Sequence, residues 1–137
     1  LFFMFPRATH PLTPAQLAKA IEERTASTVV LLEDRVVGFA NFYLCEPGKK
    51  CAIGNVIVDP SCRGKGVGSY LVQTMTEIAF AQFNAAEVEI SCFNRNVAGM
   101  LLYEKLGFRP HSIEERQDNL GNRVALIHMK MERPAGL

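Results

Sequence analysis

Apolar side chains recur along this chain with the two periods expected of helices and strands. They follow helical spacing over residues 66–83, at Val67, Tyr70, Leu71, Met75 and Ile78. Two further helices are predicted, over residues 14–24 and 96–106. Thr13 is the expected N-cap of the first, and Gly107 is expected to end the last.

Strands are predicted where runs of β-branched and aromatic residues lie between turn signals. In chain order they cover residues 29–32, 36–44, 51–58 and 87–92, a segment from Phe108, and residues 125–131. The first two form a hairpin around residues 33–35, and a polar turn at 118–122 precedes the last. This order of strands and helices predicts an α/β fold (α+β in some classifications), with a mixed central sheet and helices on both faces.

The strand at 51–58 is joined to the next helix by a glycine-rich turn, Arg63-Gly64-Lys65-Gly66-Val67-Gly68. The first amide groups of a helix lack partners within the helix, and the helix dipole adds partial positive charge there. Glycines let the backbone approach a bulky anion, whereas a Cβ at Gly66 or Gly68 would occupy the space that the anion needs. Together with the charges of Arg63 and Lys65, this pattern favours binding of a diphosphate.

Two nucleotide-binding fingerprints fail at this turn. A Walker loop requires Ser or Thr after its lysine, whereas Gly66 follows Lys65. The dinucleotide fingerprint Gly-x-Gly-x-x-Gly meets Ser69 at its third glycine when it starts at Gly64, and Leu71 when it starts at Gly66. A variant of the fingerprint with alanine or serine at this place stays an alternative for the first register. A glycine-rich turn by itself is also typical of a plain connection between a strand and a helix.

Two motifs together resemble the GNAT superfamily of N-acetyltransferases. The first, Arg63-x-x-Gly66-x-Gly68 after Val58-Asp59-Pro60, resembles the family's motif for binding acetyl-coenzyme A (acetyl-CoA). The second is Asn96-x-x-Gly99-x-x-x-Tyr103, closed by Gly107-Phe108, with a glycine in place of the family's usual alanine. The resemblance covers residues 29–131 and implies the GNAT fold.

The resemblance also implies a cofactor site, with acetyl-CoA as co-substrate and no metal. The turn that would bind the pyrophosphate consists of Arg63, Gly64, Lys65, Gly66, Val67, Gly68 and Ser69. The pantetheine arm would lie along residues 55–58, against the backbone of Val56, Ile57 and Val58. Because this backbone has to be accessible, the strand should splay away from the strand at 87–92. Asn96 and Tyr103 complete the implied site.

Tyr103 is the candidate general acid, since a phenol of pKa about 10 can donate to the thiolate of coenzyme A. Seven residues return almost to the starting direction on a helix, so Asn96 and Tyr103 share one face. Asn96 is also the expected N-cap of that helix. The alternative for Tyr103 is an amphipathic core residue at a helix end.

No general base stands out. The strand at 51–58 has no carboxylate, and Gly54-Asn55 occupies the place where many family members have an acidic residue. Glu89 and Ser91 share one face of the next strand, and either is a candidate to order a proton-removing water. A solvated Glu89 and a water chain held by the backbone are the alternatives.

Composition and length fit one small domain over residues 1–137. With 48% hydrophobic residues the chain can bury a single core, and its net charge of +1 draws it neither to nucleic acid nor to a membrane surface. Its four cysteines are scattered without a Cys-x-x-Cys pair, which is typical of reduced thiols in a cytoplasmic protein. The histidines lack metal-ligand spacing and are interpreted as ordinary surface or strand residues; they are His10, His111 and His128.

The first residues form an apolar cluster, Leu1-Phe2-Phe3-Met4-Phe5, which resembles the tail of a helix. The resemblance implies a strand and most of a helix before this point. We therefore expect the domain to be N-terminally incomplete and the family's N-terminal strand to be absent from this chain.

The motifs favour an N-acetyltransferase that transfers acetyl from acetyl-CoA to a primary amine by direct attack in a ternary complex. The acceptor would be a small molecule or a peptide amine. The alternative is a non-catalytic acyl-CoA-binding or sensing module of the same fold, which the lack of a clear base favours. In the family, the hairpin around residues 116–123 often shapes the acceptor site or a dimer contact, so a homodimer is a further expectation.

Overall fold

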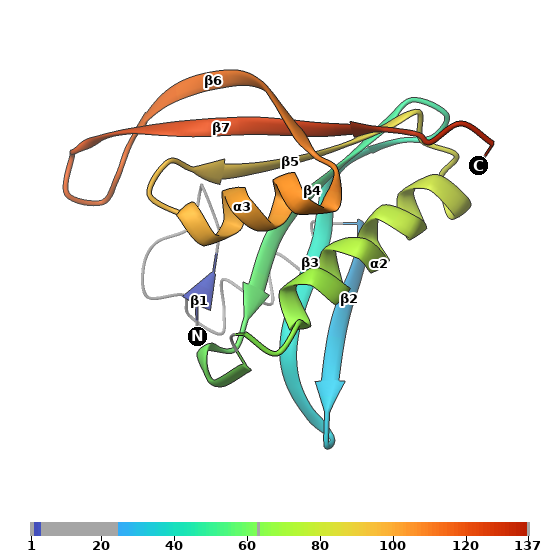
Figure 1. The fold of residues 1–137 in the computed structure, drawn as a ribbon, viewed down its shortest axis with the longest axis horizontal. Helices are drawn as coiled ribbons and strands as arrows, with labels where there is room; N and C mark the ends of the chain where they lie inside the picture. Colours follow the sequence, from blue (N-terminus) through green and yellow to red (C-terminus); the bar gives the residue numbers. More distant parts are fainter. Residues whose placement is uncertain (1, 4–24, 63, 137) are drawn as a thin grey trace.

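The structure, a computed structural model, describes residues 2–3, 25–62 and 64–136. One sheet of seven strands has the spatial order β2-β3-β4-β5-β7-β6, and β1 pairs with β4 (Figure 1). The predicted mixed sheet is confirmed, because β4 and β5 run parallel while the other neighbours run antiparallel.

The elements lie close to the predicted ranges. The strands are β1 (Phe2–Phe3), β2 (Thr25–Leu32), β3 (Arg35–Glu46), β4 (Lys50–Val58), β5 (Glu87–Phe93), β6 (Arg109–Gln117) and β7 (Arg123–Glu132). The helices are α2 (Val67–Gln82) and α3 (Val97–Leu106), with a 3-10 turn η1 at Pro60–Cys62. No helix in the described part of the chain is long and apolar enough to cross a membrane.

The hairpin of β2 and β3 is longer than the sequence indicates. Its two-residue turn consists of Glu33 and Asp34, which have φ angles of 51° and 65°. Positive φ at both turn positions matches the right-handed twist of the flanking strands, so pairing extends close to the turn.

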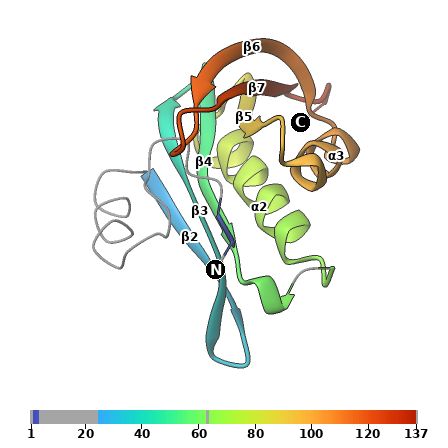
Figure 2. The ribbon, with the colours of Figure 1, turned by 90° about the vertical axis from the view of Figure 1, so that its left-hand side faces the viewer.

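Both described helices pack on the same face of the sheet (Figure 2). The buried side chains of β5, such as Val88 and Ile90, belong to one apolar cluster with Met75 of α2 and Tyr103 of α3. The helix predicted at 14–24, with its cap at Thr13, lies outside the described residues. A helix on the opposite face therefore stays a prediction.

The short strand β1 corrects one expectation. Phe2 and Phe3 form a strand rather than the tail of a helix, and they pair with Val58 and Ile57 of β4. The edge of a strand offers unpaired backbone groups to any nearby extended segment, whatever its apolar pattern suggests.

The predicted splay of β4 and β5 is confirmed. Their pairing starts at Lys50↔Glu87 and its last pair is Ile53↔Ile90. Beyond that pair β4 continues to Val58 and β5 to Phe93, and the two strands point in different directions (Figure 1). The divergence opens the sheet between its two parallel strands.

Candidate functional site

The turn between β4 and α2 has the conformation that an anion site needs. Gly64 and Gly66 have φ angles of 77° and 81°, and a Cβ added at either position would meet no atom within 4 Å. Gly66 is the N-cap of α2, so no side chain caps this helix. The first backbone N–H groups of α2 therefore have no side-chain cap, and the helix dipole adds partial positive charge there.

The charged side chains of the turn are only partly described. Arg63 lies outside the described residues, so its predicted role stays a prediction. Lys65 is exposed, and Ser69 is half-buried in the first turn of α2. Asp59, before the turn, accepts hydrogen bonds of 2.9 Å from the backbone N and the Oγ of Ser61. The backbone bond first, and then the side-chain bond, lowers the pKa of Asp59 from its ordinary value.

Gly68 lies in the first turn of α2, close to α3 and to the end of β4. A Cβ there would lie 3.5 Å from Leu102 Cδ2 and 3.8 Å from Val58 Cγ2, which is ordinary contact rather than open space. These contacts leave room for a Cβ among the protein's own atoms, and the expectation that it would fill the anion's space stays a prediction.

The edge of β4 that faces β5 is partly occupied. Ile57 and Val58 pair with β3 on one edge, so β1, which pairs with the same two residues, lies on the other. The expected pantetheine path along residues 55–58 uses this second edge. A ligand bound to the backbone of Ile57 or Val58 would have to displace β1.

The start of α3 confirms one role of Asn96. Its side-chain Oδ1 accepts a 3.0 Å hydrogen bond from the backbone N of Gly99, which is the N-cap geometry expected from the sequence. A Cβ at Gly99 would come within 2.8 Å of Asn96 Cγ. The glycine that replaces the family's usual alanine therefore leaves room for this cap.

Tyr103 is 1% exposed in the core, and its ring makes an edge contact with Phe108 at 6.3 Å between centroids. Burial is the main cause that raises the pKa of its phenol above the ordinary value, and nearby Cys92 adds to the shift. The phenol is thus held neutral, as a hydrogen-bond donor. Its burial also agrees with the alternative of a core residue, so the general acid stays a proposal.

Glu89 and Ser91 lie on the face of the sheet turned away from α2 and α3, which we call the distal face. Glu89 Oε1 lies 3.6 Å from Lys50 Nζ and 3.7 Å from His111 Nε2, and its side chain is 15% exposed. The alternative of a solvated Glu89 is therefore wrong. Ser91 Oγ lies 2.7 Å from His128 Nδ1.

The two described histidines lie close together on neighbouring strands, β6 and β7. His111 and His128 lie with ring centroids 6.3 Å apart, and His128 Nε2 lies 3.1 Å from Glu114 Oε2. Both lie on strands, so the prediction of surface or strand residues is confirmed for these two, whereas His10 lies outside the described residues. Within the described part of the chain, no three His, Cys, Asp or Glu side chains could hold a metal ion.

Pairing of β7 with both neighbours produces this cluster. Ser91 is the direct cross-strand partner of His128, and Glu114 lies diagonally opposite on β6. Ser91 and His128 are 37 residues apart in the chain, so only the register of β5 and β7 could have revealed the contact. From the sequence, only the period of two along β5 pointed to this site, and it identified Ser91 but not its partners.

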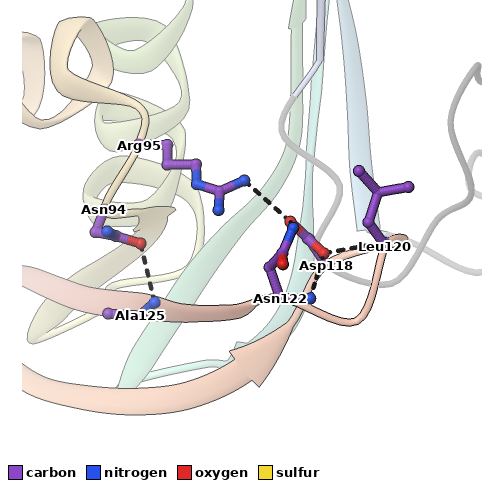
Figure 3. Close-up of polar contacts among 6 residues, drawn as sticks. All are labelled: Asn94, Arg95, Asp118, Leu120, Asn122 and Ala125. Carbon is purple, nitrogen blue, oxygen red and sulfur yellow. Dashed lines mark hydrogen bonds and ion pairs between the residues drawn. The ribbon is translucent and has the colours of Figure 1, made fainter.

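Polar contacts fasten the β6–β7 turn to the loop before α3 (Figure 3). Arg95 Nη1 donates to Asp118 Oδ2 at 2.9 Å, and the backbone N of Ala125 donates to Asn94 Oδ1 at 2.9 Å. Asp118 Oδ1 also accepts from the backbone N of Leu120 and Asn122. Hydrogen bonding from the backbone N of Asn122 is the main cause that lowers the pKa of Asp118.

Comparisons with known proteins agree on one family. Residues 2–108 match the model of the acetyltransferase (GNAT) family. A Bacillus subtilis (strain 168) protein, provisionally named as a phosphinothricin acetyltransferase, is 32% identical over 73% of this chain and 65% of its own length. The glucosamine 6-phosphate N-acetyltransferase of Trypanosoma brucei brucei is 29% identical over 79% of this chain and 78% of its own.

Solved structures share the fold. One provisionally named phosphinothricin N-acetyltransferase superposes with a TM-score of 0.76, at 27% identity, over 90% of this chain and 83% of its own. The chain thus spans about two thirds of the Bacillus subtilis relative and most of this structure.

The contact between Asn96 and Gly99 predicts a non-additive pair of substitutions. Asn96→Ala should lower the free energy of unfolding by about 0.5–2 kcal/mol through loss of the cap. Gly99→Ala alone should also destabilise, because its Cβ collides with the Asn96 side chain. In the Asn96→Ala background the same change should be neutral or stabilising, by up to about 1 kcal/mol, since alanine is the better helix former. Urea denaturation of the four proteins measures the coupling, and additive effects would contradict it.

Proposed function

The chain belongs to the GNAT family of acetyltransferases, and we propose that it transfers the acetyl group of acetyl-CoA to a primary amine by direct attack within a ternary complex. The observation that carries this proposal is the position of the open glycine turn beside the divergence of β4 and β5. The turn suits a diphosphate, and the divergence exposes strand edges to which an amide-containing arm can bind.

The proposed cofactor site follows the turn and the end of β4. The pyrophosphate would bind to backbone amides of the turn, residues 63–69, with Lys65 adding charge from the surface. The pantetheine arm would lie along Val56, Ile57 and Val58 once β1 has left this edge. Asn96 supports the site through the first turn of α3. No step of this proposal uses a metal.

Tyr103 is proposed to stabilise the leaving thiolate. Its raised pKa makes complete proton release harder than for an ordinary phenol, so a hydrogen bond to sulfur is its main contribution. Its position on α3, against Cys92 of β5, supports this role, because it lies beside the part of β5 that has left β4. Ser91 or Glu89 is proposed to order the water that removes the proton of the amine.

The acceptor is proposed to be a primary amine on a small molecule or a peptide. Two relatives carry names of enzymes for phosphinothricin and for glucosamine 6-phosphate, which supports the small-molecule class without selecting one member. Charged groups of both signs on the distal face, such as Glu89 and Lys50, are consistent with a polar acceptor.

We also propose one domain over residues 1–137, acting in the cytoplasm. The four free cysteines support a reducing compartment. A homodimer through the β6–β7 hairpin is proposed as well, because β6 is an edge strand with an exposed apolar residue. Ile113 on this strand is 71% exposed, and Leu120 in the turn between β6 and β7 is 86% exposed.

Release of free thiol from acetyl-CoA tests the proposal, with polyamines, amino acids, amino sugars, aminoglycosides and peptides as candidate acceptors. An acetyltransferase should release one thiol for each amine acetylated, which mass spectrometry of the product verifies. Tight binding of acetyl-CoA without thiol release on any amine would instead support the non-catalytic binding module.

Gly66→Ala should weaken acetyl-CoA binding and raise its KM, because a Cβ at φ 81° strains the turn and intrudes beside the first amides of α2. Gly48→Ala is the matched control, since Gly48 has a φ of 79° and equally open surroundings, but lies before β4 at the far end of that strand. Both should lose similar stability in thermal denaturation, and isothermal titration should show weaker binding for Gly66→Ala alone. Equal affinity of the two variants would contradict the assignment of the turn.

Tyr103→Phe should lower kcat by about 10²- to 10⁴-fold and leave the KM for acetyl-CoA nearly unchanged, because the hydroxyl acts on the departing sulfur. Tyr70→Phe is the control, since Tyr70 is 63% exposed on α2. Steady-state kinetics at saturating amine measure both. A Tyr103→Phe enzyme with full kcat would make Tyr103 a core residue only.

A further inference from the structure

On the distal face, hydrogen bonds join Ser91 to two side chains that the proposed chemistry has not used, His128 and Glu114. Ser91 Oγ contacts His128 Nδ1 at 2.7 Å, and His128 Nε2 contacts Glu114 Oε2 at 3.1 Å. The three residues come from β5, β7 and β6, and cross-strand pairing aligns them side by side. These hydrogen bonds therefore cross the sheet from β5 through β7 to the edge strand β6.

The carboxylate of Glu114 determines the direction of the hydrogen bonds. Arg116 Nε donates to Glu114 Oε1 at 2.8 Å; this bond, followed by the one from His128, lowers the pKa of Glu114. An ionised carboxylate can only accept, so Nε2 of His128 carries a hydrogen. In the neutral imidazole Nδ1 is then the acceptor, and the Ser91 hydroxyl donates to it. The remaining lone pairs of Ser91 Oγ are left to accept from another donor.

Ser91 stands where the sheet opens. It is the first residue of β5 after Ile90, the last residue paired with β4. Its neighbour Cys92 points to the opposite face, toward Tyr103. A thioester held between the diverging strands would thus have Tyr103 on one side and Ser91 on the other.

The corresponding place on β4 has no room for a base. Gly54 shares the distal face with Ser91, because Ala52 pairs with Glu89 two residues earlier. A Cβ at Gly54 would lie 2.8 Å from Tyr43 Cδ1, so any side chain there would collide with the tyrosine ring. This contact explains why position 54 carries no carboxylate, and it directs the search for a proton acceptor to the neighbouring strand β5.

We propose that Ser91, His128 and Glu114 form a proton relay in which Ser91 contacts the acceptor ammonium and His128 is the base. The inference rests on the proposed acetyl transfer. An ammonium proton passes to Ser91 Oγ while the hydrogen of Ser91 passes to Nδ1 of His128, which leaves a neutral amine and an imidazolium stabilised by Glu114. The amine lone pair then bonds to the thioester carbon, and the C–S electron pair leaves with sulfur. The second proton of the nitrogen neutralises the thiolate, and the imidazolium returns its proton to water.

Other charged groups lie around this relay. On β6 they are His111 and Arg116, on β5 Glu89, on β7 Lys130 and on β4 Lys50. Glu89 contacts both Lys50 and His111, Lys130 contacts Glu87, and Arg116 contacts Glu114 of the relay. His111 is consequently the competing candidate for the base.

The test is the pH dependence of kcat/KM for the full chain with the best amine from the thiol-release panel. His128→Gln should lower the rate by about 10²- to 10⁴-fold near neutral pH. The ratio of wild-type to variant kcat/KM should fall by roughly tenfold per pH unit as the pH approaches the pKa of the amine, because a free amine needs no base. This pKa is about 8 for an α-amine and about 10.4 for a lysine. Binding of acetyl-CoA should be unchanged. Ser91→Ala should show the same alkaline recovery, whereas a merely structural defect would not depend on the amine's protonation.

His111→Gln is the matched control, since it removes the neighbouring imidazole and leaves the hydrogen bonds of His128 with Ser91 and Glu114 in place. It should keep the wild-type pH profile. A wild-type profile in His128→Gln, or alkaline recovery in His111→Gln instead, would overturn the relay while leaving acetyl transfer standing. Wild-type protein that acetylates no amine would overturn the proposed function and the relay with it. Circular dichroism and acetyl-CoA affinity show whether each variant is folded.

Discussion

The end of the β4–β5 ladder at Ile53 and Ile90 is the constraint on which the rest of the site depends. Parallel strands that pair along their whole length leave no room between them for a ligand. Here the two strands part, and each is followed by a turn and a helix, α2 after β4 and α3 after β5. Because α2 packs mainly on β3 and β4 while α3 packs on β5, the helices maintain the divergence of their strands.

Beyond the last pair with β4, successive residues of β5 point to opposite faces of the sheet and to different parts of the proposed site. Period-two alternation sends Cys92 into the core beside Tyr103 and sends Ser91 to the distal face beside His128. A buried phenol and a partly exposed imidazole are chemically suited to the two ends of acyl transfer, one to stabilise the leaving group and the other to accept a proton. The sheet separates the phenol from the imidazole, so the phenol cannot pass its proton directly to the imidazole.

Local signals account for what could be predicted from the sequence. The glycine turn, the cap at Asn96 and the end of α3 at Gly107 each depend on residues within a few positions, so the pattern was sufficient. The contact between Ser91 and His128 depends on the register of β5 and β7, and the collision of a Gly54 side chain with Tyr43 depends on the register shifts between β3 and β4. No local pattern encodes these, because a bulge shifts every later residue of its strand relative to its partner.

Register therefore links a remote turn to the chemistry. A slip of β7 by one residue would place Ile127 or Met129 opposite Ser91 and turn His128 into the core. The contacts of Asn94 with Ala125 and of Arg95 with Asp118 hold the beginning of β7 and its turn against the β5–α3 loop. As surface contacts they contribute little to the free energy of unfolding. They lie, however, at the beginning of β7, and the position of its first residues determines the register of every later pair along the strand. Residues at the β6–β7 turn thus determine that His128 lies beside Ser91, although they contact neither substrate.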